Sequence, residues 1–392
     1  MSEVQIAIIG GGVVGCAVAM ELSKRHEGIF IFEKNPGIIR GENQSSRNSG
    51  VIHSGIYYDQ ETRPLKAGLC VEGNRLLYDF CTTNQVPFIK CGKLIAATSC
   101  EEDRILDLYL KRAVENEVPG VTKIPSEKIK ELEPNVLAVS ALDVPASGIV
   151  DPSSLVYRLH TLAQKGGAEF ITGTEVVDIR KGGGLFEILI RYPDGAKDHV
   201  STGLVINSAG VDADLIAKMI NPGSPYTIDP ILGESYKFYS DKRRELRMGG
   251  RNIYPTPTTV RTAGNLHFTV GVHLTPTLQD LNPPYHTGST VTVGPRLRPL
   301  DDRTAKPEVL TPADVFLEKV KKYFPGLKET DLSPHQAGHQ ARLKGYKDFI
   351  IREDSLNPGF INLLGIDSPG LTSCIAIARK VGKMVDRITR TD

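Results

Sequence analysis

The chain has 392 residues, of which 40% are hydrophobic and 24% charged, and its formal net charge is +1. These values are typical of a folded globular protein with room for two domains, and the near-neutral charge argues against a nucleic-acid-binding protein. The six cysteines form no C-x-x-C pair, which favours packed thiols in a reducing compartment over disulfides or a metal site.

The first predicted elements are a strand, a glycine-rich turn and a helix. Residues 4–9 are apolar over the length of a buried strand, and Gly10, Gly12 and Gly15 follow as G-x-G-x-x-G. In this pattern the first glycine makes a tight turn, the second lets a pyrophosphate approach the backbone, and the third lets helix and strand pack closely. The helix that follows should turn an apolar face inward, formed by Val14, Ala17, Val18 and Leu22.

A second buried strand, residues 29–32, ends at Glu33. An acid at this place accepts hydrogen bonds from a ribose, while the helix N-terminus attracts the phosphates. The segment therefore predicts a dinucleotide site, although it does not choose between NAD and FAD. Because the first strand begins so close to the N-terminus and no apolar run is long enough to span a membrane, we expect a cytoplasmic protein.

The next segment, SSRNSGVIHSGIYY at residues 45–58, fits neither a regular helix nor a buried strand. Its serines offer short hydroxyl groups, Arg47 offers a charge, and its glycines allow the backbone to approach a ligand closely. For an arbitrary histidine, packing in the core is the better interpretation. In this setting we favour a ligand-facing role for His53.

The remaining chain repeats the pattern of strand, glycine turn and helix. Alternating strands with turns at residues 181–184 and 193–195 predict hairpins. Residues 204–219 then predict a buried strand, a Ser-Ala-Gly turn and a helix, and residues 360–388 predict the same series again. The last helix carries an apolar stripe of Leu371, Ile375, Ala378 and Val381.

Together these pieces resemble the D-amino-acid-oxidase-like (DAO) family of FAD-dependent oxidoreductases, and within it the L-2-hydroxyglutarate dehydrogenase/oxidase branch. The matching pieces run from end to end and include GGGVVGCAVAMELSK, LKAGLCVEGNRLLYDFC, GKLIAAT, SGIVDPSSL, GESYKFY and GVHLT. LLGIDSPGLTSCIAIA matches as well, and SRNSGVIHSGIYY and GIDSPGLT are specific to this branch.

The resemblance implies an α/β fold, in which a Rossmann-like FAD-binding domain of the GR2/DAO type joins a second, mixed-sheet α+β domain that roofs the flavin. We place the discontinuous FAD-binding domain at residues 1–85, 147–218 and 333–392. The substrate-binding roof then takes residues 86–146 and 219–332.

The resemblance also implies the residues that bind FAD. A helix starting near Leu371 would direct its positive end at the flavin and favour its reduction, while Asp367 braces the turn before it. The full set of expected FAD contacts is Gly10, Gly12, Val13, Val14, Gly15, Glu33, Lys34, Ser45, Ser46, Arg47, Asn48, Ser49, Val176, Val177, Ala209, Gly210, Gly365, Asp367, Gly370, Leu371 and Thr372.

Oxidation of a 2-hydroxy acid needs a hydride acceptor, a base for the hydroxyl proton and cations for the carboxylates. Flavin N5 is the acceptor, and a neutral histidine suits the base because its ordinary pKa lies near working pH. His53 and His273 are the candidates that match the branch. The expected substrate contacts are Tyr57, Tyr236, Lys237, Tyr254 and Arg342.

The carboxylate sites depart from the branch. An arginine is common there just before Gly-Glu, where this chain has Leu232, and another is common where it has Gln340. Glutamine cannot replace the bidentate, permanently charged fork of an arginine. Arg342, Lys237 and His339 are the candidates to take over one carboxylate, and a substrate other than a five-carbon dicarboxylate is the alternative.

The first expected activity is oxidation of L-2-hydroxyglutarate with FAD and no metal. Alternatives within the family are a glycerol-3-phosphate dehydrogenase and an amine or amino-acid oxidase; a non-catalytic or electron-relay flavoprotein is an alternative of another class. The electron acceptor, whether O2, a quinone or an electron-transfer protein, leaves no trace in the sequence. The basic segment Asp241–Arg251 is the one hint of peripheral membrane contact, at the inner face, although a solvated loop explains it better.

Overall fold

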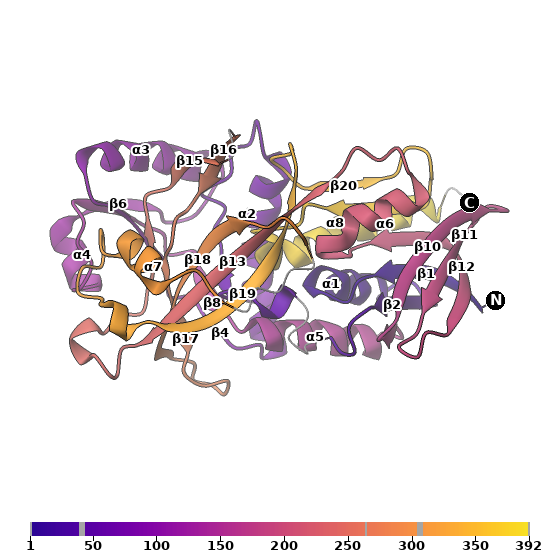
Figure 1. Ribbon diagram of the computed structural model, residues 1–392, viewed down its shortest axis with the longest axis horizontal. Coiled ribbons are helices and arrows are strands. Elements are labelled where there is room, and N and C mark those ends of the chain that lie inside the picture. Colours follow the sequence, from indigo (N-terminus) through magenta and orange to yellow (C-terminus); the bar gives the residue numbers. More distant parts are fainter. Residues whose placement is uncertain (1, 39–43, 263–264, 304–308, 391–392) are drawn as a thin grey trace.

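The computed structural model describes residues 2–38, 44–262, 265–303 and 309–390. Two large sheets organise the chain, one toward each end of the long axis, and both chain termini lie at the end formed by the first sheet (Figure 1). This is the expected α/β fold, in which a dinucleotide-binding half joins a second mixed-sheet half.

The first sheet has the strand order β10-β11-β12-β1-β2-β9, with β21 beside β12 and β20 beside β21. Strand β1 pairs in parallel with both β2 and β12, which brings the carboxyl ends of these strands to one edge. Strands β10, β11 and β12 form the predicted antiparallel hairpins. The bounds are Ser2–Ile9 (β1), Ile29–Glu33 (β2), Glu169–Thr172 (β9), Glu175–Gly182 (β10), Leu185–Arg191 (β11), Lys197–Asn207 (β12), Ile350–Glu353 (β20) and Phe360–Leu364 (β21).

Helices cover this sheet and build its core. All ten residues of α1 (Val13–Leu22) are buried, so the helix is not half-exposed as its predicted apolar face suggested. The reason is that α1 packs against α5 and α8 as well as against the sheet. The helices of this half are α2 (Pro64–Asn84), α5 (Pro152–Lys165), α6 (Ala213–Ile220) and α8 (Gly370–Ile388).

The second sheet has the order β19-β13-β18-β17-β14-β5-β7-β6. Its core is a cluster of aliphatic and aromatic side chains that includes Phe238, Phe316 and Phe324. The bounds are Lys93–Ala97 (β5), Thr122–Pro125 (β6), Ser140–Asp143 (β7), Ile228–Tyr239 (β13), Asn252–Pro255 (β14), Leu274–Leu278 (β17), Thr287–Pro299 (β18) and Ser333–Leu343 (β19). Helices α3 (Cys100–Glu115), α4 (Ser126–Leu132) and α7 (Ala313–Val320) belong to this half (Figure 1).

Two smaller sheets and four short helices complete the fold. The order β3-β8-β4 forms a three-stranded sheet, and β15 pairs with β16. Their bounds are Val51–Ile52 (β3), Phe88–Ile89 (β4), Gly148–Val150 (β8), Thr258–Thr262 (β15) and Asn265–Thr269 (β16). The 3₁₀ turns are Gln44–Ser46 (η1), Gly210–Asp212 (η2), Arg244–Leu246 (η3) and Glu329–Asp331 (η4).

Strand β19 joins the second sheet, although the sequence analysis placed residues 333–343 in the last FAD-binding segment. Its backbone pairs antiparallel with β13 from Ile228↔Leu343 to Lys237↔Ser333. The chain returns to the first sheet only afterwards, at β20 and β21. β19 is therefore a long strand of the second sheet. We propose the other domain boundaries as given in the sequence analysis.

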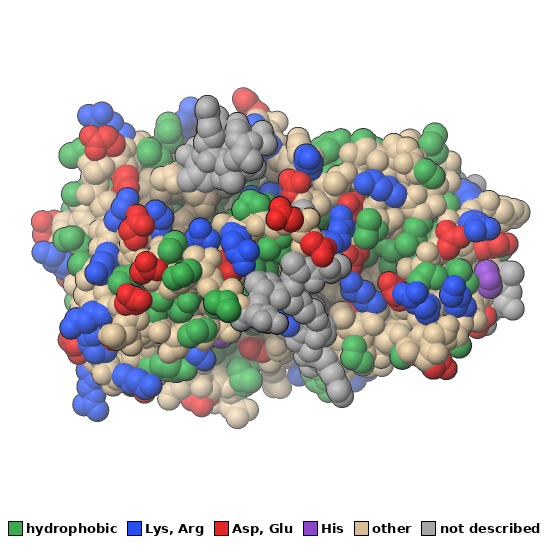
Figure 2. Space-filling model, viewed as in Figure 1, with side chains coloured by type: hydrophobic (Ala, Val, Ile, Leu, Met, Phe, Trp, Pro, Cys, Tyr) green, Lys and Arg blue, Asp and Glu red, His purple; other side chains and the backbone are tan. Residues whose placement is uncertain are grey.

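The basic segment Asp241–Arg251 is partly neutralised by neighbouring carboxylates. Arg243 pairs with Asp331 at 2.8 Å, and Arg251 pairs with Asp143 at 2.7 Å. On the face drawn in Figure 2, basic and acidic side chains are interspersed. This supports the solvated-loop interpretation of the segment. None of the helices among the described residues is both long enough and apolar enough to cross a membrane.

Candidate active site

A cavity of about 1090 Å³ is lined by residues from both halves of the molecule. The first half contributes the turn after β1, the end of β2 and the N-terminal turn of α8. The second half contributes residues of β13, β18 and β19, among them Gly233, Pro295 and Gly338. The volume is at the upper end of the range for ligand pockets, which leaves room for a dinucleotide together with a small substrate.

The glycine turn after β1 is packed so closely that Gly10 and Gly15 have no room for a Cβ atom. Gly10 has φ +99°, and a Cβ atom there would lie 2.6 Å from the carbonyl oxygen of Ser208. A Cβ atom on Gly15 would lie 1.9 Å from the carbonyl oxygen of Gly10. Gly10 and Gly12 line the cavity, whereas Gly15 serves the helix–strand packing predicted for it.

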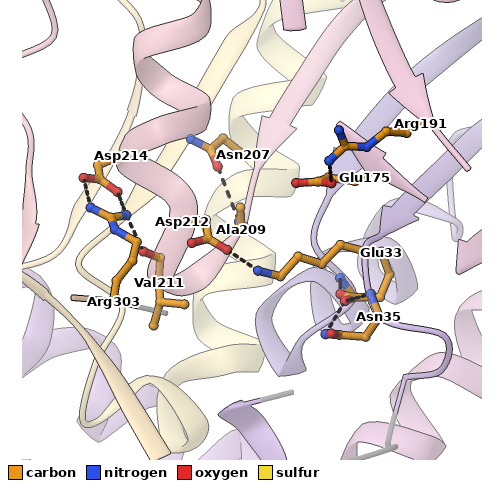
Figure 3. Close-up of polar contacts among 12 residues, drawn as sticks. Glu33, Asn35, Glu175, Arg191, Asn207, Ala209, Val211, Asp212, Asp214 and Arg303 are labelled. Carbon is orange, nitrogen blue, oxygen red and sulfur yellow. Dashed lines mark hydrogen bonds and ion pairs between the residues drawn. The ribbon is translucent and has the colours of Figure 1, made fainter. Parts of the chain in front are cut away.

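Glu33 closes the edge of the sheet beside this turn. Its carboxylate accepts hydrogen bonds from the backbone N–H of Gly11 at 2.7 Å and from the Asn35 side chain at 2.6 Å. The neighbouring Lys34 pairs with Asp212 at 2.5 Å, which joins the end of β2 to the turn after β12 (Figure 3). Glu33 is buried but lines the cavity. A carboxylate can accept more than these hydrogen bonds, so a ribose hydroxyl in the cavity can donate to it as well.

Arg303 reaches across from the second half to the same region. Its guanidinium donates to both oxygens of Asp214, at 2.7 and 3.0 Å, and to the carbonyl of Val211 at 3.0 Å (Figure 3). Arg303 itself lines the cavity. This cross-link holds a segment of the roof against the helix that follows β12, and the sequence analysis did not find it.

The serine-rich segment at residues 45–50 is held by its own polar groups. The hydroxyl of Ser45 accepts from the N–H of Val13 at 2.9 Å, so it completes the N-terminus of α1. The Asn48 side chain donates to the Ser45 carbonyl at 2.6 Å and accepts from the Gly50 N–H at 2.8 Å. Arg47 donates to the carbonyl of Ala337 in β19 at 3.2 Å, which ties the segment to the roof.

The turn before α8 forms another wall. Asp367 pairs with Lys66 at 2.6 Å and lies 3.7 Å from Nε of Arg342, so it braces the turn as predicted. Gly370 and Leu371, at the start of α8, face the cavity. The N-terminal end of a helix offers unpaired N–H groups and partial positive charge to whatever lies there.

His53 lies in the wall next to this turn. Its backbone N–H donates to the Thr372 hydroxyl at 3.0 Å, and its Nε2 lies 3.4 Å from the Ser368 hydroxyl. Its Nδ1 is buried and has no hydrogen-bond partner among the residues that the structure describes. Burial, then Lys93, then His273 lower the pKa of His53 well below its ordinary value, so the imidazole is neutral at physiological pH.

His273 stacks on a tyrosine in the same wall. Its ring lies parallel to that of Tyr254, with centroids 3.8 Å apart, and Tyr254 in turn stacks on Tyr57 at 6.3 Å. The Nδ1 atom is 3.1 Å from the carbonyl of Gly271 and must carry the proton, because a carbonyl only accepts. Burial lowers the pKa of His273 to about 3, which leaves Nε2 with a free lone pair.

Most of the predicted site residues line this one cavity. Both histidines do, as do Tyr57, Tyr254 and Arg342 among the substrate candidates. The FAD candidates that line it are Gly10, Gly12, Val13, Val14, Glu33, Lys34, Ser45, Arg47, Asn48, Ser49, Val176, Ala209, Gly210, Gly365, Asp367, Gly370 and Leu371.

The other candidates lie behind the wall. Tyr236 packs on Phe316 and donates its hydroxyl hydrogen bond to the carbonyl of Thr311 at 2.9 Å, and Lys237 lies 5.5 Å from the Tyr239 ring. Thr372 supports His53 and Val51 through its hydroxyl. The candidates outside the lining are Gly15, Ser46, Val177, Thr372, Tyr236 and Lys237. Gly233 and Ser235 of β13 line the cavity instead, and the pairing of β13 with β19 shifts register directly after them, between Ser235 and Tyr236.

Several cations in the lining were missed by the sequence analysis. Arg63, Lys66 and Arg112 all line the cavity, beside the tyrosines of the second half. Arg112 pairs with Asp59 at 3.3 Å and lies 5.3 Å from the Tyr109 ring. Lys66 lies in the family-matching piece LKAGLCVEGNRLLYDFC, whereas no motif marks Arg63 or Arg112. Only the fold brings the start of α2 and the end of α3 together.

The residues present fit FAD. The glycine turn and the start of α1 suit a pyrophosphate, Glu33 suits a ribose, and the start of α8 suits the electron-accepting end of the flavin. Nδ1 of His53 is a polar atom at the cavity that no described residue satisfies with a hydrogen bond. Such an atom is expected where a bound group completes the site.

Comparison with known proteins agrees with this fit. The family model for FAD dependent oxidoreductases (DAO) matches residues 5–384. The chain is 32% identical to mitochondrial L-2-hydroxyglutarate dehydrogenase of Arabidopsis thaliana, over 97% of this chain and 83% of that protein. It is 30% identical to L-2-hydroxyglutarate dehydrogenase of Indibacter alkaliphilus, over 97% of this chain and 98% of that protein.

A solved structure shares the fold over nearly the whole chain. FAD-bound L-alpha-glycerophosphate oxidase of Mycoplasma pneumoniae matches with a TM-score of 0.85 and 26% identity, over 98% of this chain and 95% of that one. The sequence motifs, the two-sheet fold, the glycine turn and the family match agree with one another. The chain belongs to the DAO family of FAD-dependent oxidoreductases.

Proposed function

We propose that this oxidoreductase oxidises a small 2-hydroxy acid, with L-2-hydroxyglutarate as the first substrate to test. The observation that carries the proposal is the wall of the cavity, where two neutral histidines, His53 and His273, face the same space as the dinucleotide-binding turn. A neutral imidazole is suited to accept the proton of a substrate hydroxyl. The identities of 30% and 32% to two L-2-hydroxyglutarate dehydrogenases support the choice of substrate.

In this proposal each part of the wall has a separate task. When bound, FAD accepts the hydride from the substrate carbon. His273 takes the hydroxyl proton on Nε2, since its Nδ1–H is held by the Gly271 carbonyl. The ring of Tyr254 packs against His273 and fixes the orientation of the imidazole.

Cations at one end of the cavity would hold the carboxylates. Arg63 and Arg112 line the cavity, with Arg63 5.7 Å from the Tyr58 ring and Arg112 5.3 Å from the Tyr109 ring. Arg342 also lines it, although Asp367 and Gln340 lie within 3.7 Å and 3.5 Å of its guanidinium. Leu232, which stands where the branch commonly has an arginine, is buried in β13 and does not line the cavity. We therefore propose that Arg63 and Arg112 bind the carboxylate in place of that arginine.

A glycerol-3-phosphate dehydrogenase is the second candidate. The match to a glycerophosphate oxidase supports it, and the same cations would then bind a phosphate. Amine or amino-acid oxidation needs no base and leaves the two histidines without a task. A purely structural or electron-relay flavoprotein does so as well.

The substrate is tested by adding candidates anaerobically to the purified, FAD-loaded protein while the visible spectrum is recorded. We expect L-2-hydroxyglutarate to bleach the flavin absorbance and the D-enantiomer to have no effect, because hydride transfer needs one face of the substrate carbon against the flavin. Bleaching by glycerol 3-phosphate instead would transfer the proposal to the second candidate. A flavin that no hydroxy acid bleaches would contradict the proposed function.

The cofactor site is tested by replacing Glu33 with Ala. We expect FAD affinity to fall by about 10- to 100-fold, because hydrogen bonds to a charged group contribute about 1.5–3 kcal/mol each. The dissociation constant is read from flavin fluorescence after dialysis against dilute cofactor. Glu169→Ala, on the exposed end of the neighbouring strand β9, is the matched control. A Glu33→Ala protein that retains FAD like the control would count against the ribose contact.

A further inference from the structure

Lys93 is a buried lysine at the start of β5, behind the wall of the cavity. Its side chain has no exposed surface, and its Nζ forms no hydrogen bond or ion pair with any described residue. Lysine is almost never fully buried unless it is paired. The rest of the strand, residues 94–97, is apolar and entirely buried, so the amine stands out in this setting.

The amine lies against the aromatic side chains that form the wall. Nζ is 3.9 Å from the ring centroid of Tyr254 and 5.1 Å from that of Tyr57. His273 stacks on Tyr254 with centroids 3.8 Å apart. These rings line the cavity and Lys93 does not, so about one layer of side chains separates the amine from a bound substrate.

The same wall continues into the cationic end of the cavity. Tyr57 meets Tyr109 edge-on at 5.8 Å, and the guanidinium of Arg112 lies 5.3 Å from the Tyr109 ring. Arg112 is therefore joined through Tyr109 to Tyr57, one of the tyrosines that cover Lys93, and Arg63 lies 5.7 Å from the ring of the adjacent Tyr58. An anion drawn to these arginines would lie within range of the buried amine.

The titratable groups around Lys93 are neutral ones. They come from every element packed against it: Cys70 in α2, Cys91 before β5, His53 and Tyr57 after β3, Tyr254 in β14 and His273 before β17. Arg251, whose charge lowers the pKa of Cys91, is already paired with Asp143. No described carboxylate neutralises the amine.

The charge of Lys93 is therefore easily changed. Burial lowers the pKa of Lys93 to about 7, against a weaker opposing effect of Cys70 and Cys91. A negative charge about 8 Å away, at an effective dielectric constant of about 20, would raise this pKa by about one to two pH units. Near neutral pH the amine would then gain a proton when an anion arrives.

We propose that Lys93 is the buried counter-charge for an anionic substrate, and that its amine takes up a proton from solvent when the anion enters the cavity and releases it when the anion leaves. The proposal deepens the proposed function and rests on it only in requiring a small anion. A 2-hydroxy acid and a glycerol phosphate both satisfy that requirement. Lys93 acts through the wall and is a positioning residue.

Calorimetric titration of the FAD-loaded, oxidised protein measures this proton directly. The probes are 2-oxoglutarate and dihydroxyacetone phosphate, the oxidised products of the two candidate substrates, which do not reduce the flavin. Comparing buffers with different heats of ionisation at pH 8 should give about 0.5–0.7 proton taken up per bound anion. The dissociation constant should rise roughly tenfold between pH 7 and pH 9.

Two substitutions of Lys93 separate its charge from its packing. Lys93→Met should bind the anion with proton uptake near zero and with little change in affinity between pH 7 and pH 9. Lys93→Arg keeps a permanent charge, so it should also take up no proton while retaining neutral-pH affinity at pH 9. Lys90→Met is the control, because Lys90 is exposed and its ring contact is with Tyr78.

The outcomes distinguish this proposal from the proposed function. Tight binding of either anion without proton uptake in the wild type, or with uptake preserved in Lys93→Met, would overturn the role of Lys93 and leave the substrate proposal standing. Binding of dihydroxyacetone phosphate alone, with uptake, would support Lys93 and overturn the hydroxy-acid substrate. Failure of both probes to bind would overturn the anion site itself.

Discussion

Replacing His273 by Ala is expected to slow flavin reduction by the substrate by about 10²- to 10⁴-fold, the usual contribution of a general base. The hydrogen bond between Nδ1 and the Gly271 carbonyl fixes the tautomer and leaves Nε2 as the acceptor. Burial lowers the pKa of this imidazole to about 3, so Nε2 is unprotonated over the whole physiological range. The same shift makes it a weaker base than an ordinary imidazole, whose pKa lies near working pH. Stopped-flow absorbance under anaerobic conditions gives the reduction rate at saturating substrate.

The FAD content of His273→Ala should remain close to that of the wild type. The imidazole contacts Tyr254 and Gly271, whereas the glycine turn, Glu33 and the start of α8 form the dinucleotide side of the cavity. His286→Ala, on an exposed loop of the second half, controls for the loss of an imidazole.

A parallel His53→Ala variant assigns the base between the two histidines. His53 touches the turn before α8 through Ser368, but its Nδ1 has no partner to fix a tautomer. We therefore expect the larger loss from His273. If neither variant slows flavin reduction, proton transfer must use another group and both assignments would be withdrawn.

The dinucleotide half could be predicted from the sequence because its signals are local. The strand before Gly10, the helix after it and the acid at Glu33 are consecutive, and each has a physical task at a fixed spacing. The same holds for the hairpins of β10–β12 and for the final strand and helix. The local sequence pattern did not predict that α1 is buried on every side. That burial comes from helices α5 and α8, which are distant in sequence.

The substrate end could be predicted only in part, because it is assembled from distant segments. The two histidines were found through the family resemblance. Arg63 and Arg112 come from separate elements with no motif, and Lys93 lies in the matching piece GKLIAAT but was given no role. Tyr236 was a candidate hydroxyl donor and Lys237 a candidate cation, whereas Gly233 and Ser235 of the same strand line the cavity, before a register shift between Ser235 and Tyr236. The pairing of β19 with β13 could not be predicted for a similar reason, since the two strands lie about a hundred residues apart.

Replacing Lys93 by Met is expected to stabilise the FAD-loaded, substrate-free protein at pH 6.5, by about 2–4 kcal/mol in the free energy of unfolding. The substitution removes a buried, unpaired amine and puts an apolar side chain of similar length in an apolar strand. For a chain of this length such a gain corresponds to a rise of roughly 2–5 °C in the thermal midpoint. The measurement is a thermal scan of the FAD-loaded protein, with Lys90→Met as the control.

The gain should depend on pH in a direction set by the amine. Burial lowers the pKa of Lys93 from 10.5 in the unfolded chain to about 7 in the folded one, so between these values the unfolded state binds more protons. Below pH 7 the buried charge therefore lowers the free energy of unfolding of the wild type by its full amount. This loss of stability becomes smaller as pH rises toward 10.5. The difference between Lys93→Met and the wild type should accordingly be largest at pH 6.5 and smaller at pH 9.

The sign of this difference separates a functional lysine from a structural one. If the contacts of the amine with Tyr57 and Tyr254 stabilise the fold, Lys93→Met will unfold at a lower temperature than the wild type at both pH values. If the variant is instead more stable and has also lost the proton uptake on anion binding, Lys93 serves anion binding at a cost in stability. Functional sites are where such exchanges are expected, because a charge placed for a ligand is left without a partner until the ligand arrives.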